Sequence, residues 1–185
     1  MDFLTAMGVL VVMIVAATVL MWLWTVFNSF VTFRNEAFIR LGRIKAAQEK
    51  KLDMIEQLLG AVKEKAGSDE EILNEINGLR EKSAMGGPGE VGKADKESMA
   101  LTEKLLSMAG TDPALRSSAM VTSMEQTIKE LDTEIACQKK EYDDMVRRYN
   151  ALMDASPSGV IGELSGMHRL ELMDPEEPEL AGPTA

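Results

Sequence analysis

Residues 121–152 read VTSMEQTIKELDTEIACQKKEYDDMVRRYNAL. Large side chains recur in this stretch at alternating steps of three and four residues, which is the spacing of one face of a helix. The series comprises Val121, Met124, Ile128, Leu131, Ile135, Gln138, Tyr142, Met145, Tyr149 and Leu152. A seam of this length is typical of a long helix that packs against other helices. We therefore expect one helix over residues 114–153 in a protein built from helices.

Three shorter segments before this stretch also have helical periodicity. Residues 38–62 place apolar side chains on one face, and Gln48 is the polar member of that series. A second helix, with Ser68 as its N-cap in capping-box spacing, is expected to run to about Lys82. A third is expected over about 94–109. Four helices of this size are enough to bury a common core.

A glycine-rich stretch separates the second and third predicted helices. Residues 85–93 read MGGPGEVGK, a composition that favours a loop. A phosphate-binding loop needs a Ser or Thr after the Gly-Lys pair and a buried strand before it. Here Ala94 follows Gly92 and Lys93, so a nucleotide site is not expected.

The first 33 residues contain a long apolar segment. No charged residue occurs from Phe3 to Phe33, and about 20 residues of α-helix already span the hydrocarbon core of a bilayer. A cleaved secretory signal begins with Lys or Arg and ends in small residues after a short apolar core. This segment instead begins with Asp2 and ends just before Arg34. We therefore expect an uncleaved signal anchor over residues 1–33.

Positive charge lies on one side of this predicted anchor. Six Lys and Arg residues occur from Arg34 to Lys51, and none precedes the apolar segment. The positive-inside rule therefore predicts a single-pass protein of the cell membrane, with its N-terminus outside and residues 34–185 in the cytoplasm. Aromatic and basic side chains at this end of the anchor are expected at the membrane interface. They are Trp22, Trp24, Arg34, Arg40 and Arg43.

The composition excludes several classes of function. The formal net charge is -10 and aromatic residues make up 5%, whereas nucleic-acid surfaces need basic and stacking side chains. The single cysteine, Cys137, excludes an intramolecular disulfide and a cysteine-cluster zinc site. The single histidine, His168, is too few for the di-iron sites of helical bundles, although Glu171 follows it at helical spacing. We therefore expect no cofactor, no metal and no nucleic-acid partner.

Net charge also changes along the chain. Residues 34–66 are net positive, whereas residues 67–153 and 154–185 are net negative. The last of these regions is rich in proline and glycine, and we expect its acidic end to be disordered. Apolar residues at Val160, Ile161, Leu164 and Met167 predict one short helix within it. The acidic distal part favours a protein partner with a basic surface over nucleic acid.

The order of these features resembles the LemA family over nearly the whole chain. The most specific part is Tyr142, Tyr149 and Asn150, followed by Pro157 and a short tail that contains isoleucine and glycine. The stretch LDMIEQLLGAVKE, residues 52–64, resembles the family's leucine-rich run after two basic residues. The resemblance implies an all-α fold, with a single N-terminal transmembrane helix followed by an elongated antiparallel helical bundle. It implies no established catalytic activity.

The chain departs from the family pattern at two places. Asp112 precedes Pro113 where an aromatic residue is common, and the glycine-rich stretch at 85–93 is unusual. These departures affect the expected lengths of the middle helices. We expect an anchor over 1–33, a cytoplasmic bundle over 34–153 and a tail over 154–185.

The expected function is that of a membrane-anchored scaffold, without enzymatic activity, that binds a protein partner or self-associates. Two alternatives stay open. One is a small-ligand sensor or an enzyme, with a site between helices that uses carboxylates and the tyrosines at 142 and 149. The other is a protein that remodels membrane surfaces through its basic segment and its tail.

Overall fold

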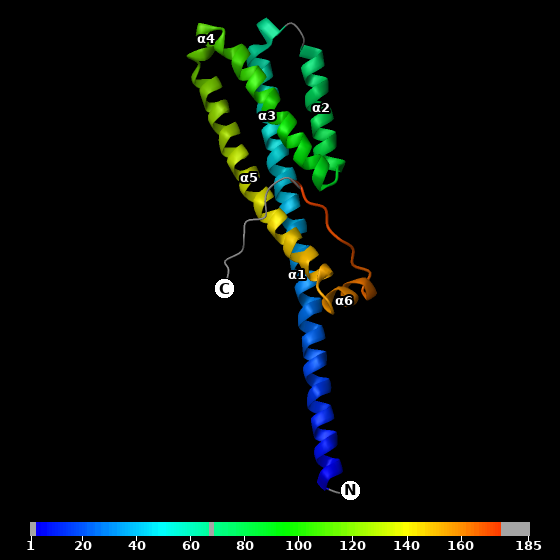
Figure 1. The fold of residues 1–185 in the computed structure, drawn as a ribbon. Helices are drawn as coiled ribbons and strands as arrows, with labels where there is room; N and C mark the ends of the chain where they lie inside the picture. Colours follow the sequence, from blue (N-terminus) through cyan, green and yellow to red (C-terminus); the bar gives the residue numbers. More distant parts are fainter. Residues whose placement is uncertain (1–2, 67–68, 175–185) are drawn as a thin grey trace. The chain divides into compact units, whose positions relative to one another are not determined.

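The computed structural model describes residues 3–66 and 69–174 (Figure 1). Within these residues the fold consists of helices without any strand, which confirms the predicted all-α class. The helices are α1 (Phe3–Ala66), α2 (Asp69–Met85), α3 (Pro88–Gly110), α4 (Pro113–Arg116), α5 (Ala119–Asp154) and α6 (Ser158–Leu164). The chain forms two compact units. The first comprises Met1–Glu36 and Met145–Leu170, and the second comprises Ala37–Asp144 and Glu171–Ala185.

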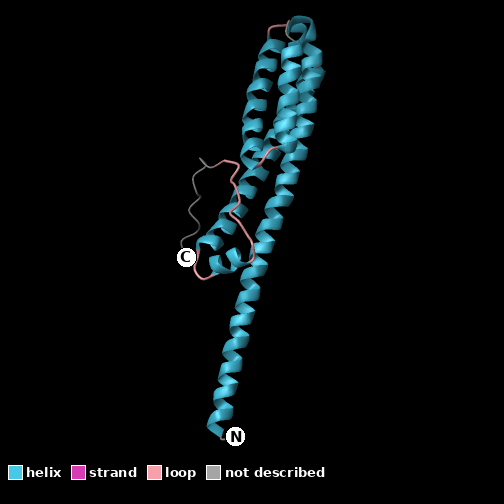
Figure 2. Ribbon diagram, turned by 90° about the vertical axis from the view of Figure 1, so that its right-hand side faces the viewer, coloured by secondary structure: helices cyan, strands magenta, loops and turns pink. Residues whose placement is uncertain are grey.

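The second unit is an antiparallel helical bundle. Residues 37–66 of α1 lie beside α2, α3 and the first part of α5, and successive long helices alternate in direction (Figures 1 and 2). Most of the apolar residues expected from the periodicity form its core, but Phe38, the first of the predicted series, is 52% exposed. Core members include Leu52, Ile55, Leu59, Ile76, Leu79, Leu105, Val121, Met124 and Ile128. Each fully buried aliphatic side chain of this size contributes about 1.5–3 kcal/mol of hydrophobic stabilisation.

The long C-terminal helix is shorter than predicted. Residues 114–153 were expected to form one helix, but α4 and α5 are separated at Ser117 and Ser118. The Ser117 hydroxyl donates to the carbonyl of Pro113 at 2.9 Å, and serine side chains that bond the local backbone compete with helix continuation. Val146 is also fully buried although it lies outside the predicted seam. An α-helix has 3.6 residues per turn, so its buried face drifts away from a strict heptad.

The predicted loop at 85–93 is wrong for most of its length. Only Gly86 and Gly87 separate α2 from α3, and helix α3 begins at Pro88. Proline is favoured in the first turn, and the Glu90 carboxylate accepts a hydrogen bond from the Gly87 amide at 3.3 Å. Gly86 is required at the turn because a Cβ atom there would overlap the carbonyl oxygen of Lys82. The predicted N-cap Ser68 lies outside the described residues.

The first unit combines an exposed apolar helix with a small core. Residues 3–25 of α1 expose their large apolar side chains, for example Val12 at 68% and Trp24 at 74%. This helix is long and apolar enough to cross a membrane. Further along, Phe30 is fully buried and packs against Tyr149 in an edge-to-face arrangement, with ring centroids 5.4 Å apart and planes at 77°. The uncharged stretch therefore has an exposed part and a covered part, which the sequence did not distinguish.

The predicted short tail helix exists as α6, but it buries a different face. Ser158, Gly159 and Gly162 are its buried residues, whereas Leu164 is 85% exposed. The glycines allow close packing on Met153, since a Cβ atom at Gly159 would overlap the Met153 carbonyl oxygen. Helix α6 is therefore held by the close approach of its backbone to Met153, rather than by the apolar face that the sequence predicted. The acidic end predicted to be disordered, residues 175–185, lies outside the described residues.

Candidate functional site

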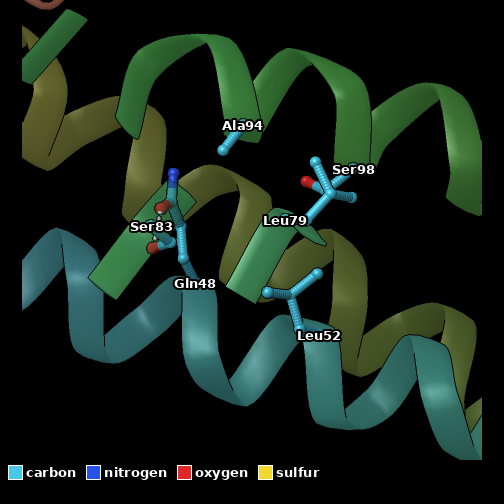
Figure 3. A pocket seen from close by; sticks show the side chains of 6 residues that line it. All are labelled: Gln48, Leu52, Leu79, Ser83, Ala94 and Ser98. Atoms are coloured by element: carbon cyan, nitrogen blue, oxygen red, sulfur yellow. Dashed lines mark hydrogen bonds between the residues drawn. The ribbon is translucent and has the colours of Figure 1, made fainter. Parts of the chain in front are cut away.

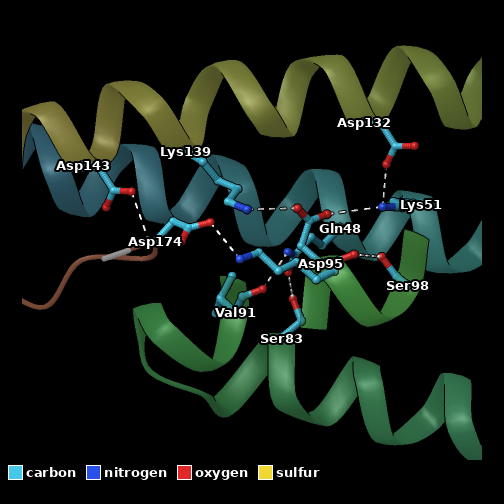
Figure 4. Close-up of polar contacts among 11 residues, drawn as sticks. Gln48, Lys51, Ser83, Val91, Asp95, Ser98, Asp132, Lys139, Asp143 and Asp174 are labelled. Carbon is cyan, nitrogen blue, oxygen red and sulfur yellow. Dashed lines mark hydrogen bonds and ion pairs between the residues drawn. The ribbon is translucent and has the colours of Figure 1, made fainter. Parts of the chain in front are cut away.

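A group of charged side chains lies inside the second unit. Lys51 on α1 is 0% exposed, and its ammonium nitrogen is 3.2 Å from Asp95 Oδ1 on α3 and 2.5 Å from Asp132 Oδ1 on α5 (Figure 4). The contact with Asp132 is an ion pair without an aligned hydrogen bond. An unpaired ammonium in this position would cost several kcal/mol of desolvation, so the two carboxylates are what allow the lysine to be buried.

A second lysine completes the charge balance. Lys139 on α5 places its ammonium 3.2 Å from Asp95 Oδ2, so Asp95 contacts a different lysine with each oxygen. Two ammonium groups and two carboxylates are then gathered from three helices. We call Lys51, Asp95, Asp132 and Lys139 the charged core.

Neutral polar groups extend this arrangement to α2. The Gln48 amide donates to the carbonyl of Val91 at 3.0 Å, and it accepts a hydrogen bond from the Ser83 hydroxyl at 2.5 Å (Figures 3 and 4). Both side chains are buried. The space that they share with Leu52, Leu79, Ala94 and Ser98 leaves no room for a water molecule (Figure 3). These contacts connect α1, α2 and α3 by direct hydrogen bonds, without a ligand cavity at this point.

The geometry of the charged core suits a structural role. Its groups pair with one another, and buried ionic contacts from different helices specify how those helices align rather than adding much net stability. General acid–base chemistry needs a titratable group within reach of a substrate proton. Lys51 and Asp95 are instead enclosed by the bundle.

Residues 171–174, which follow Leu170, bind the bundle through their main-chain groups. The Tyr142 hydroxyl donates to the Glu171 carbonyl at 2.8 Å, and the Asp143 carboxylate accepts from the amides of Met173 at 2.8 Å and Asp174 at 3.2 Å. Gly92 permits this approach, because a Cβ atom there would lie 2.7 Å from the Met173 carbonyl oxygen. Residues 171–174 are therefore part of the second unit rather than a free tail.

The motif residues expected from the family resemblance are all in structural positions, and they fall in both units. Tyr142 holds residue 171 in the second unit, whereas Tyr149 packs on Phe30 in the first. Asn150 pairs with the main chain of Leu170, donating to its carbonyl at 2.9 Å and accepting from its amide at 3.0 Å. Pro157, which follows a cis peptide bond, precedes the first residue of α6.

Both tyrosine hydroxyls are held in the neutral form. Burial raises the pKa of Tyr142, and the nearby Asp143 and Glu171 carboxylates raise it further. Burial also raises the pKa of Tyr149, and the positive charge of Arg34 opposes that rise. Both phenols therefore stay protonated at neutral pH, where neither can serve as a base.

The residues predicted for the membrane interface have different surroundings. Trp22, Trp24 and Arg34 are exposed in the first unit, and Arg43 is exposed in the second. Arg40 is partly buried and forms an ion pair with Glu141 in the second unit. That contact gives Arg40 a role in the bundle, and an interface role for the other four stays a prediction.

The charged core was not predicted from the sequence, because Lys51 also belongs to the basic segment that follows the predicted anchor. One signal was available. Lys51 lies three residues after Gln48 and four before Ile55, so it falls on the same helical face as the apolar series. Asp132 and Lys139 likewise lie seven residues apart beside the α5 seam. Charges of opposite sign on the buried faces of several helices indicate pairing.

Comparison with known proteins identifies a family. The model of the LemA family matches residues 40–184, which include nearly all of the bundle and both motif tyrosines. No curated protein matches the chain.

Proposed function

The chain belongs to the LemA family, and on that basis we propose that it is a single-pass membrane protein whose bundle is a scaffold for protein–protein interaction. The observation that carries the proposal is the exposure of α1 over residues 3–25. Leu23 is partly buried, and the exposed large apolar side chains of this stretch, from Phe3 to Trp24, are 41–82% exposed. A water-soluble protein rarely exposes so large a contiguous apolar surface, whereas lipid covers such a surface at no cost.

The proposed anchor has the length that a bilayer requires. Residues 3–25 as a helix span about 34 Å, close to the roughly 30 Å hydrocarbon core. Beyond them, Phe30 is packed inside the first unit, so the membrane segment of the proposal ends before that residue. The basic residues after Phe33 support an orientation with the bundle in the cytoplasm and the N-terminus outside the cell membrane.

The bundle is proposed to act by binding rather than by catalysis. Its buried charges are paired with one another, and Tyr142 is committed to a main-chain carbonyl. An exposed acidic surface remains available to a partner or to a second copy of the chain. Nucleic acid is not a partner in this proposal, because phosphate binding requires a basic surface.

Cys137 gives a direct test of topology. It is exposed on α5 and is the chain's single cysteine. In intact cells, a membrane-impermeant maleimide should leave Cys137 unlabelled until the cells are permeabilised. A D2C/C137S variant is the matched control and should be labelled without permeabilisation. Labelling of Cys137 in intact cells would overturn the orientation, and release of the protein by carbonate washing would overturn the anchor.

The scaffold role is tested separately. A photo-crosslinking amino acid placed at exposed bundle positions, one at a time, should give a discrete adduct in native membranes at some positions. A bundle that gives no adduct at any exposed position, and that remains monomeric in detergent by light scattering, would count against a scaffold.

A further inference from the structure

A groove of about 650 Å³ lies between α3 and α5 in the second unit. It extends over about two turns of each helix, from Met99 to Ser107 on one side and from Glu125 to Asp132 on the other. Pockets of 300–1,000 Å³ hold small ligands, but this groove is lined along two neighbouring antiparallel helices. That form suits the face of another helix better than an enclosed small molecule.

The lining of the groove has two kinds of surface. Met99, Leu106 and Ile128 contribute apolar atoms, and Met99 is half exposed. Methionine adapts its shape to different partners, so its exposure at the rim suits a binding surface. The core residues beneath are already packed, since Ile128 belongs to the hydrophobic core.

The charged part of the lining is mostly acidic. Its carboxylates are those of Glu103, Glu125 and Asp132, and its one ammonium group is that of Lys129. Lys129 is bound to Glu125 at 2.6 Å along the same helix. Glu103 is exposed, and the Asp132 side chain is 25% exposed although it also contacts Lys51. Lys129 offsets Glu125 and Lys51 offsets Asp132, so the negative charge that the lining retains beside its apolar strip is that of the exposed Glu103.

We propose that this groove is the docking site for an amphipathic helix of a partner protein, with lysine or arginine residues beside a strip of apolar side chains. The proposal rests on the scaffold function above and adds its site and the chemistry of its partner. Charge complementarity selects this occupant. Two copies of the groove placed face to face would instead oppose their acidic side chains.

The test uses the full chain in nanodiscs of neutral phosphatidylcholine. The probe is a fluorescein-labelled helical peptide with leucine on one face and lysine on the other, and a second peptide has glutamate in place of every lysine. Fluorescence anisotropy, corrected for empty nanodiscs, should show binding of the lysine peptide that weakens with added salt. E103K should raise its Kd by about fivefold or more, in the range expected for inverting a partly exposed charge at a binding surface.

The matched control is E134K, which makes the same change of net charge on an exposed residue of α5 outside the groove. It should change the Kd by less than about twofold, since only non-local charge is altered. If E103K lowers the thermal midpoint of the bundle, Glu103→Gln replaces it, with the same direction expected. Equal effects of E103K and E134K, or equal binding of the glutamate peptide, would overturn the groove as the site.

Crosslinking in native membranes separates this inference from the scaffold proposal. A photo-crosslinker at Met99 should give the adduct, and its loss in E103K would support the groove. Adducts at position 134 but not at 99 would overturn the groove and leave the scaffold standing. An adduct at 99 with a second copy of the chain would overturn the basic partner helix. The absence of adducts at every position would instead contradict the scaffold itself.

Discussion

Each of the two parts of helix α1 departs from the usual distribution of side chains, in a different way. Residues 3–25 expose valine, leucine, methionine and tryptophan, whereas residues 37–62 bury Lys51 and Gln48 among apolar neighbours. One continuous helix therefore has apolar groups outside in one unit and polar groups inside in the other. The contrast shows that whether a side chain is buried depends on the groups it can pair with and on the solvent around it. A lysine is buried where two carboxylates meet it, and apolar groups are exposed where lipid is the proposed surroundings.

The largest expected effect comes from removing the buried lysine. Lys51→Met should lower the free energy of unfolding by about 3–5 kcal/mol, because Asp95 and Asp132 would keep charges without their common partner. Urea unfolding of the full chain in detergent, followed by circular dichroism at 222 nm, measures this change. Lys50→Met is the matched control at an exposed neighbour and should stay within about 0.5 kcal/mol. Equal stability of both variants would show that Lys51 is solvated.

A charge placed in residues 3–25 of α1 should have a slightly smaller effect, in this case on the free energy of membrane insertion. Val15→Arg places a charge in the middle of the exposed apolar segment and should raise the apparent free energy of membrane insertion by about 2.5–3.5 kcal/mol. Membrane fractionation with a topology reporter measures the inserted fraction. Val15→Leu should insert as the original chain does. Full insertion of the arginine variant would contradict residues 3–25 as the membrane segment.

The small core of the first unit gives a third test. Gly159→Ala should destabilise that unit by about 1–3 kcal/mol, because the new methyl group would overlap the Met153 carbonyl. Tryptic cleavage within residues 145–170 should become faster, since the packing against Phe30 loosens. Gly60→Ala, where no atom lies within 4 Å of the added carbon, should instead stabilise helix α1 by roughly 0.5–1 kcal/mol. A common sign for both substitutions would refute the packing explanation.

A smaller effect is expected where the second unit uses a polar contact to hold residues 171–174. Tyr142→Phe removes the hydrogen bond to the Glu171 carbonyl and should lower the free energy of unfolding by about 0.5–1.5 kcal/mol. Hydrogen exchange of the Met173 amide should become faster. Glu134→Gln, on the exposed side of the same helix, should leave both quantities unchanged.

The two tyrosines should make the stability of the fold depend on pH in alkali but not at neutral pH. Their pKa values are raised in the folded chain, so their contribution to stability is complete below about pH 10 and is lost as the pH rises above it. Phenolate absorbance at 295 nm should therefore appear at higher pH in the folded chain than in urea. These are the chain's two tyrosines, so no third one obscures the signal. Coincident titrations would contradict their burial.

Most of the fold could be predicted because helical periodicity is a local property of the sequence. The series from Phe38 to Val62 and the α5 seam identified the helices correctly. The glycine content gave a wrong prediction at residues 88–93, where Pro88 and Glu90 provide a good helix start that outweighs Gly89 and Gly92. The break at Ser117 depends on a side-chain hydrogen bond, which periodicity does not reveal.

The charged core could not be predicted to the same degree because its members are far apart in the sequence. Lys51 and Asp95 are separated by 44 positions, and only the packing of α1 on α3 and α5 makes them neighbours. The basic residues around Lys51 also suggested a membrane-facing segment. The motif tyrosines were identified from the family resemblance. Their contacts could not be predicted, because Tyr142 bonds Glu171 and Tyr149 packs with Met167, and both partners are distant in the sequence.

The charged core also constrains how the sequence can change over evolution. Lys51 contacts both Asp95 and Asp132, and Lys139 contacts Asp95, so a substitution at any one position leaves an uncompensated charge inside the bundle. Viable descendants should therefore replace several of the four residues together, by exchanging signs or by adopting apolar groups throughout. A core position such as Met124, whose neighbours are apolar, can instead exchange singly with another apolar residue of similar volume. Inherited variation at 51, 95, 132 and 139 is thus expected to be correlated across three helices.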